Sequence, residues 1–194
     1  MITLTRWPPN LRTTPIPIDL AQIAWTRGDI TRFEVAGTQG AKSLLRDDSS
    51  AAITVAHRAE VTHLAETGEV AIFLYLDLAI GTGTPPQPSG ISGRFEMDFI
   101  FTIGNLPELL VMATDQPEPR LHPQLLLMLT SVAYSTARGI LWTRLAGTPL
   151  EGITLPLVNP AQLLQPAAPT IMLPSAVKKP RSAPARPRKS KPAQ

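Results

Sequence analysis

The feature that most constrains the fold is a strict alternation of apolar and polar side chains in the middle of the chain. Successive side chains of a β-strand point to opposite faces, so this pattern predicts antiparallel strands with one face on a core. Ala52–Leu64 and residues 91–103 alternate in this way, and residues 30–35 do so more weakly. The pattern is strongest in residues 70–80, where one face holds Val70, Ile72, Leu74, Leu76, Leu78 and Ile80. Together the four segments predict a four-stranded antiparallel sheet arranged as a meander.

The links between the predicted strands contain residues that favour turns. Residues 66–69, Glu-Thr-Gly-Glu, suit a tight hairpin. Residues 81–90 contain three glycines and three prolines, which predicts a longer loop.

After the strands the apolar pattern becomes helical. Residues 106–112 predict a short helix with Asn105 as N-cap and Pro107 at its first position. Residues 121–145 predict a long helix that ends before Gly147. This helix is apolar over more than half of its circumference, and one sheet face covers only one stripe of it, so we expect the other stripe to pack on a second subunit. The candidates for this helix–helix oligomer interface are Leu125, Val132, Ala133, Ala137 and Ile140. The fold class is therefore α+β, with a short and a long helix packed on the sheet.

Composition divides the chain into three parts. The 194 residues include 21 prolines and no cysteine, and their net charge is +3. Residues 175–194 hold seven basic side chains and no acidic one. Residues 1–174 hold the other 11 basic residues and all 15 acidic ones, so their net charge is −4. We expect a flexible proline-rich arm at residues 1–17, a folded domain at 18–165 and a disordered basic tail at 166–194.

Targeting signals are not evident. Residues 1–20 lack the apolar run of a signal peptide, and charged residues interrupt the apolar segments 70–80 and 121–145. The sequence therefore predicts a soluble, cytoplasmic protein that does not associate with membranes.

Short motifs in and after the long helix carry a family resemblance. Tyr134, Ala137 and Arg138 lie in the helix and Gly147-Thr148 ends it; Val158-Asn159 and Leu163-Leu164 follow. With the order of four strands and two helices, this resembles the bacterial export chaperone SecB and its divergent SecB-like relatives over residues 18–165.

The resemblance implies a homotetramer that acts as an ATP-independent holdase for unfolded polypeptides, in protein export with the motor SecA as a partner. SecB engages SecA through acidic sheet-face residues and its C-terminal end, whereas the C-terminal segment here is basic. An alternative is a SecB-like adaptor or chaperone dedicated to one client, such as an antitoxin.

The sequence contains no recognisable catalytic or metal-binding pattern, so we expect no enzyme, cofactor or metal. His57, His63 and His122 lack a further ligand at metal-binding spacing. Glu96 and Asp98 share the polar face of one strand, where a solvated surface is the simpler interpretation. Residues 37–43 resemble a phosphate-binding loop, but Ala41 interrupts the required Gly-Lys pair, and a solvated loop is expected.

Binding of unfolded polypeptide would need exposed apolar side chains that can repack around many sequences. The tryptophans could equally serve core or subunit packing, an alternative that the sequence leaves open. Our candidates for a client-binding groove are Trp25, Phe33, Met97, Leu126, Met128, Leu129 and Trp142.

The basic tail has two interpretations. It is either a charged, solvated leash or a weak, salt-dependent nucleic-acid binder, and its sequence offers no base readout.

Overall fold

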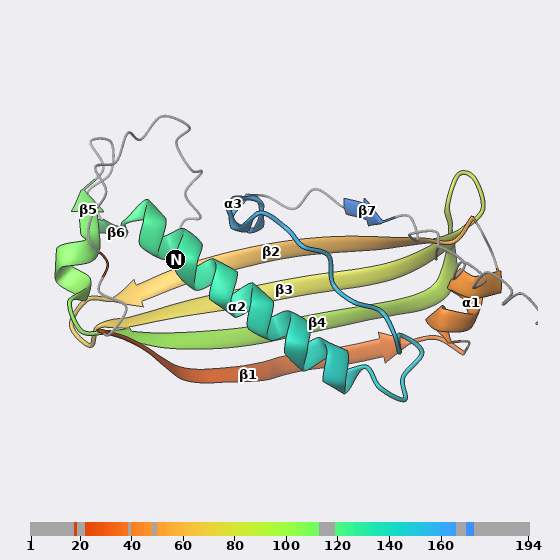
Figure 1. Cartoon of the computed structure of the whole chain (residues 1–194), viewed down its shortest axis with the longest axis horizontal. Coiled ribbons are helices and arrows are strands. Elements are labelled where there is room, and N and C mark those ends of the chain that lie inside the picture. Colours follow the sequence, from red (N-terminus) through yellow and green to blue (C-terminus); the bar gives the residue numbers. More distant parts are fainter. Residues whose placement is uncertain are drawn as a thin grey trace, which may run out of the picture.

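The computed structural model describes residues 18, 22–38, 40–47, 50–112, 119–165 and 170–172. The predicted arm, residues 1–17, and the predicted tail, residues 166–194 apart from 170–172, lie outside this part of the chain. Within it, a five-stranded antiparallel sheet carries one long helix on one face (Figure 1). The α+β class is confirmed, as are the four predicted antiparallel strands and the long helix packed on them.

Three strands follow the predicted alternation. Strand β2 (Ala52–Leu64), β3 (Glu69–Thr82) and β4 (Gln87–Ile103) are joined in sequence and pair antiparallel. The hairpin between β2 and β3 uses Gly68 at a φ of 71°, and the Ile103 amide donates to the Gly68 carbonyl at 2.8 Å. A Cβ at Gly68 would lie 2.6 Å from the Ile103 carbonyl oxygen, so this turn requires glycine.

The loop predicted at residues 81–90 is shorter than expected. Strands β3 and β4 continue past the apolar pattern to Thr82 and from Gln87, which leaves a turn at residues 83–86. Ladder hydrogen bonds need only the backbone, so pairing extends beyond the residues that need burial. The Ser89 hydroxyl supports this end by donating to the Ile80 carbonyl at 2.7 Å.

The first strand takes a different place from the one predicted. Strand β1 (Ile23–Ala36) is longer than residues 30–35 and pairs with β4, so the sheet order is β1-β4-β3-β2-β7 and not that of a simple meander. The tight β2–β3–β4 turns leave β2 and β4 as edges, and the longer link after β1 lets β1 reach the β4 edge. That link contains helix α1 (Ala41–Asp47), where a solvated loop was predicted. Ala41 is fully buried, and its amide donates to the Pro149 carbonyl.

The region before the long helix is also corrected. Residues 106–112 form a short 3-10 helix η2 (Leu106–Leu109) followed by strand β5 (Leu110–Met112), which pairs with β6 (Pro119–Leu121). Asn105 caps no backbone amide with its side chain; its Nδ2 donates to Glu108 at 3.3 Å instead. Pairing of β5 with β6 therefore replaces the last helical turn.

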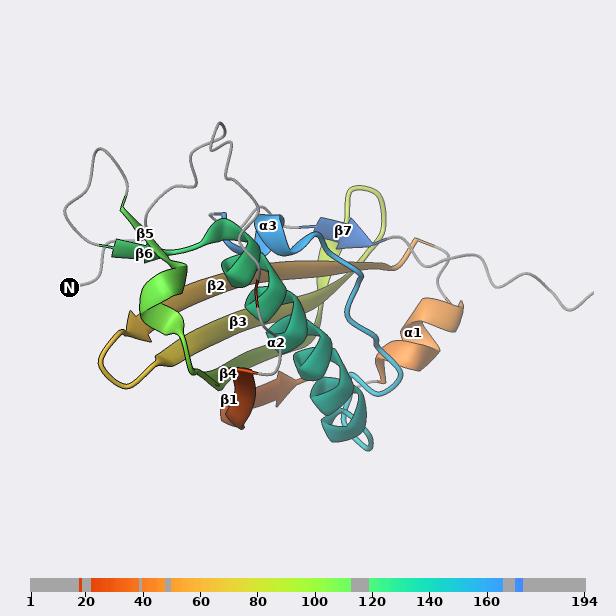
Figure 2. The same ribbon diagram turned by 60° about the vertical axis from the view of Figure 1, so that its left-hand side comes forward.

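Helix α2 (Pro123–Arg144) crosses the sheet diagonally and packs on β3 and β4 (Figures 1 and 2). His122 caps it, because the ring Nδ1 accepts from the Gln124 amide at 3.3 Å, and the chain turns away at Gly147, whose φ is 75°. By length and composition alone α2 could cross a membrane, with a mean hydropathy of 1.3, although packed core helices meet the same criterion.

Two segments complete the helix side of the sheet. Residues 153–158, here called the crossing segment, run back over the sheet from the end of α2 to the short helix α3 (Pro160–Leu163) (Figure 1). Strand β7 (Thr170–Met172) then pairs with the outer edge of β2.

Candidate polypeptide-binding surface

Strand β1 presents an apolar row toward the helix side of the sheet. Two bulges, between Trp25 and Arg27 and between Ile30 and Arg32, each add one residue. After each bulge the apolar side chains of β1 again point to the helix side of the sheet. The apolar row is therefore paired with the core-facing residues of β4 along the whole strand. The row consists of Ile23, Trp25, Gly28, Ile30, Phe33 and Val35.

The indole of Trp25 lies beside Gly28 of the strand that carries it. A Cβ placed on Gly28 would be 2.8 Å from Trp25 Cζ2 and 3.0 Å from Phe99 Cδ1, so glycine makes room for the ring. The indole Nε1 donates to the Arg27 carbonyl at 2.8 Å, which satisfies its only polar atom. The ring still remains 54% exposed. Trp25 is therefore a positioned aromatic surface with no unpaired polar group.

Phe33 repeats this arrangement farther along β1. Its ring is tilted against Phe95 of β4 with the centroids 5.2 Å apart, and it is 39% exposed while Phe95 is fully buried. The aromatic rings of β1 thus lie at the exposed rim of the hydrophobic core, whereas the aromatic rings of β4 are buried inside it.

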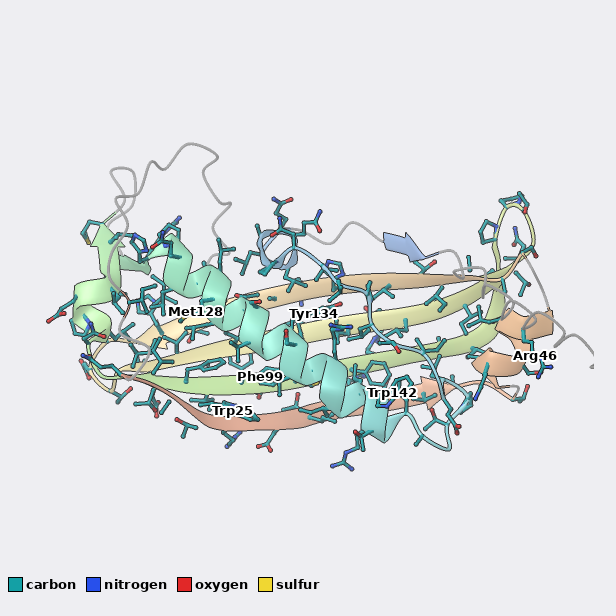
Figure 3. All side chains as sticks on the ribbon, in the orientation of Figure 1. Trp25, Arg46, Phe99, Met128, Tyr134 and Trp142 are labelled. Atoms are coloured by element: carbon teal, nitrogen blue, oxygen red, sulfur yellow. The ribbon has the colours of Figure 1, made fainter. Side chains whose placement is uncertain are left out.

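The solvent side of α2 adds a second apolar row. Val132 is 44% exposed and Trp142 is 57% exposed, whereas Met128 is half-buried. Nothing lies within 4 Å of the Cβ position of Gly139, so the helix is open between Val132 and Trp142. Figure 3 shows Trp142 at the C-terminal end of α2.

The groove candidates therefore divide into two groups. Trp25, Phe33 and Trp142 are exposed on the helix side, and Leu126 and Met128 are half-buried. The remaining two, Met97 of β4 and Leu129 of α2, are each 1% exposed and belong to the hydrophobic core. That burial corrects our assignment of these two residues, which line no surface of the single chain.

The oligomer candidates divide in the same way. Helix α2 places residues four apart on the sheet, and three of the predicted interface residues, Leu125, Ala133 and Ala137, lie on that stripe with at most 1% exposure. They are core residues of one chain, so the prediction is corrected here too. Val132 is 44% exposed, and Ile140 is only partly buried where it packs against the core, so both keep surface available for contact.

The crossing segment carries an exposed residue that sequence reasoning missed. The Tyr134 hydroxyl donates to the Pro156 carbonyl and Arg138 Nε donates to the Leu155 carbonyl, both at 3.1 Å. These bonds hold the segment on α2, and burial raises the pKa of Tyr134 to about 12. Leu157 nevertheless projects outward and is 85% exposed. Leu157 follows Pro156 and precedes Val158-Asn159-Pro160, a pattern that indicates extended backbone but does not tell which way the side chain points.

The other face of the sheet is charged and mostly self-neutralised. Arg32 pairs with Glu96 at 3.0 Å and Arg94 with Asp77 at 2.9 Å. Both arginines line a shallow depression of about 410 Å³, with the Arg58 guanidinium 4.4 Å above the Tyr75 ring. This face is chemically unlike the helix side.

The residues considered for catalysis or metal binding occupy separate places. Glu96 and Asp98 lie on the charged face, where partial burial raises the pKa of Asp98. His57 is buried beside Tyr134, with ring centroids 6.4 Å apart, and His122 is the helix cap. Among the described residues, no group of three or more histidine or acidic side chains could hold a metal ion.

Known proteins resemble this chain in structure and not in sequence. No protein-family model and no curated protein matches the sequence. Among solved structures, the Mycobacterium tuberculosis Rv1957 SecB-like chaperone, in complex with a ChAD peptide from the Rv1956 HigA1 antitoxin, is similar at a TM-score of 0.50. The match has 13% sequence identity and covers 71% of this chain and 91% of the chaperone. The chain therefore has the SecB-like fold.

Proposed function

We propose that this protein is an ATP-independent holdase that binds unfolded or non-native polypeptide on the helix side of its sheet. The observation that carries the proposal is the exposure of Trp25, Phe33 and Trp142 on the helix side of the described part of the chain, where the rings of β1 are only partly covered. The fold shared with a SecB-like chaperone supports it.

The chemistry of this surface suits binding without a fixed sequence. Each leucine or phenylalanine that a client buries contributes roughly 1.5–3 kcal/mol, whatever its neighbours are. The indole of Trp25 has its N–H already bonded, so it offers a client an apolar face and no unmet polar demand. Affinity then comes from the number of apolar side chains that the client places here.

A client dedicated to this protein is the second candidate. The similar Rv1957 chaperone was solved with a peptide of an antitoxin, which favours a SecB-like protein with one preferred partner. Export with SecA and nucleic-acid binding by residues 175–194 remain expectations from sequence, because neither rests on the described residues.

Self-association is a further part of the proposal. We infer a homo-oligomer, with a tetramer as the expected size, that uses the solvent side of α2 at Val132 and Ile140. Solution mass by light scattering measures its size directly.

The experiment is suppression of aggregation of a chemically unfolded test protein without ATP. We expect the wild-type chain to protect it, and a triple variant, Trp25→Ala with Phe33→Ala and Trp142→Ala, to bind it at least about tenfold more weakly, since tenfold corresponds to about 1.4 kcal/mol. Leu64→Ala is the matched control, because Leu64 is 58% exposed and lies on the charged face. Absence of protection at a several-fold molar excess would refute the holdase function.

A further inference from the structure

The edge of β2 is occupied by a piece of the chain's own C-terminal region. Strand β7 runs antiparallel to β2, with Ile53 opposite Met172, Thr54 opposite Ile171 and Val55 opposite Thr170. The segment lies beyond the predicted folded domain, residues 18–165, and is joined to it by residues 166–169. An extended peptide is thus already seated at this edge.

The occupant is much shorter than its partner. Strand β7 has three residues, whereas β2 has 13. Three residue pairs supply few hydrogen bonds, each of which contributes about 0.5–1.5 kcal/mol net. A strand this short and tethered by a short link is held mainly by its closeness to β2, so it can exchange with another extended segment.

In the part of β2 that pairs with β7, the side chains on the helix side are buried and the side chain on the opposite face is partly exposed. Ile53 and Val55 are 9% and 0% exposed on the helix side, while Thr54 is half-buried on the opposite face. The core therefore fixes the edge in an extended conformation before any partner arrives. A fixed edge lowers the ordering cost of adding a strand, and backbone hydrogen bonds accept any sequence except proline.

We propose that β7 is a built-in substitute for a client strand: an extended segment of unfolded polypeptide adds to β2 at residues 53–55 and displaces it. This inference rests on the proposed holdase function and names a second contact for the client, separate from the aromatic surface at β1. The alternative role for β7 is a permanent cover that protects an edge strand from aggregation.

The two roles differ in how they affect client affinity. When a self-segment occupies a binding site, the apparent dissociation constant rises by the inverse of the free fraction. If β7 is exchangeable, loosening it strengthens client binding by about three- to tenfold, which corresponds to a free fraction of roughly 0.1 to 0.3 in the wild type. A permanent cover gives no gain.

The test uses the full-length chain with Ile171→Pro, because proline has no backbone N–H and disfavours strand pairing. Ala176→Pro is the matched control, with the same change placed outside β7. Hydrogen exchange at the amides of residues 53–55 reports whether β7 has left, and fluorescence anisotropy of a labelled unfolded polypeptide reports client affinity. We expect faster exchange and three- to tenfold tighter client binding for Ile171→Pro, and neither change for the control.

A second measurement uses a synthetic peptide with the sequence of residues 168–174, added to the Ile171→Pro chain. We expect it to restore protection at residues 53–55 and to compete with the client. Unchanged exchange in Ile171→Pro, or client and peptide bound together without competition, would overturn the inference while the holdase function stands. If wild-type and control chains bind no client, the holdase function fails and client displacement with it, although peptide binding still reports on the edge.

Discussion

The two edges of the sheet are built in opposite ways. At the β2 edge, the chain returns twice: α3 packs beside β2 and β7 pairs with residues 53–55. At the β1 edge, no strand of the described residues pairs beyond β1, and its aromatic side chains remain 39% and 54% exposed. One edge is covered by the chain itself, and the other is open within the described residues.

Under the proposed holdase function, this difference would let the sheet avoid aggregation and still bind unfolded chains. An open edge strand is a hazard that natural proteins limit with charge, bulges or a cover. Strand β1 uses the first two, since its charged face carries the Arg27–Asp29 pair at 2.8 Å and its backbone has two bulges. Strand β2 uses the third. Charge restricts what docks at β1 without hiding the aromatic rings.

The largest expected effect is a difference in stability between variants of a buried ring on β4 and of an exposed ring on β1. Phe99→Ala removes a ring that is 1% exposed, and we expect it to lower the free energy of unfolding by about 3–5 kcal/mol. Phe33→Ala removes a ring that is 39% exposed, and we expect a loss of about 1 kcal/mol or less. Urea denaturation of both variants measures the contrast.

The same pair of variants tests function in the reverse direction. Phe33→Ala should weaken client binding while the chain stays folded, because its ring belongs to the exposed surface. An equal loss of stability in both variants would show that Phe33 is a core residue, and would remove it from the binding surface.

Much of the fold could be predicted because the central strands obey a simple period. Ile72, Leu74 and Leu76 alternate without interruption, and burial in the structure follows them residue by residue. The stop at Gly147 is a local effect that the sequence also carries.

The edges were harder to predict because their features are not periodic. In β1 the spacing from Trp25 to Gly28, and from Ile30 to Phe33, is three residues, so the two bulges conceal the strand from a search for alternation. The pairing of β1 with β4 depends on contacts between residues far apart in the chain, which no local pattern reports.

The candidate site was predicted only in part, because its exposed residues also depend on packing that no local pattern reports. An apolar helix face shows which residues prefer burial, but not which of two stripes meets the sheet. Leu129 and Trp142 therefore looked equivalent in sequence, although one is 1% exposed and the other 57%.

An intermediate effect is expected at the β1 edge from Gly28→Ala. The added methyl would lie 2.8 Å from Trp25 Cζ2 and 3.0 Å from Phe99 Cδ1, and Phe99 cannot move freely because it is buried. The indole must shift, at a cost of about 1 kcal/mol in the free energy of unfolding. Tryptophan fluorescence should change and client affinity should fall about twofold to fivefold, since roughly 0.4–0.9 kcal/mol of contact is lost. Gly40→Ala, whose added methyl meets nothing within 4 Å and which lies outside the apolar rows of β1 and α2, is the control and should leave the fluorescence and the client affinity unchanged.

The smallest effect is expected at the β2 edge, as a dependence of stability on pH. His57 is 5% exposed, its Nδ1 has no hydrogen-bond partner among the described residues, and Tyr134 of α2 is its aromatic neighbour. Burial lowers the pKa of His57 below the ordinary 6.5, so between these two values the unfolded chain binds more protons than the folded one. The stabilisation from neutral His57 is complete above pH 6.5 and is lost as the pH falls through 6.5 toward the lowered pKa. Urea denaturation from pH 8 to 5 should show this decline in the wild type and in His63→Gln, and a flatter profile in His57→Leu.

Hydrogen exchange tests where acid loosens the sheet. Because the apolar row of β1 contains no ionisable side chain, hydrogen exchange at the lower pH should become faster along β2 before it does along β1. An equal acceleration at both edges would mean that acid loosens the whole sheet and not the His57 site.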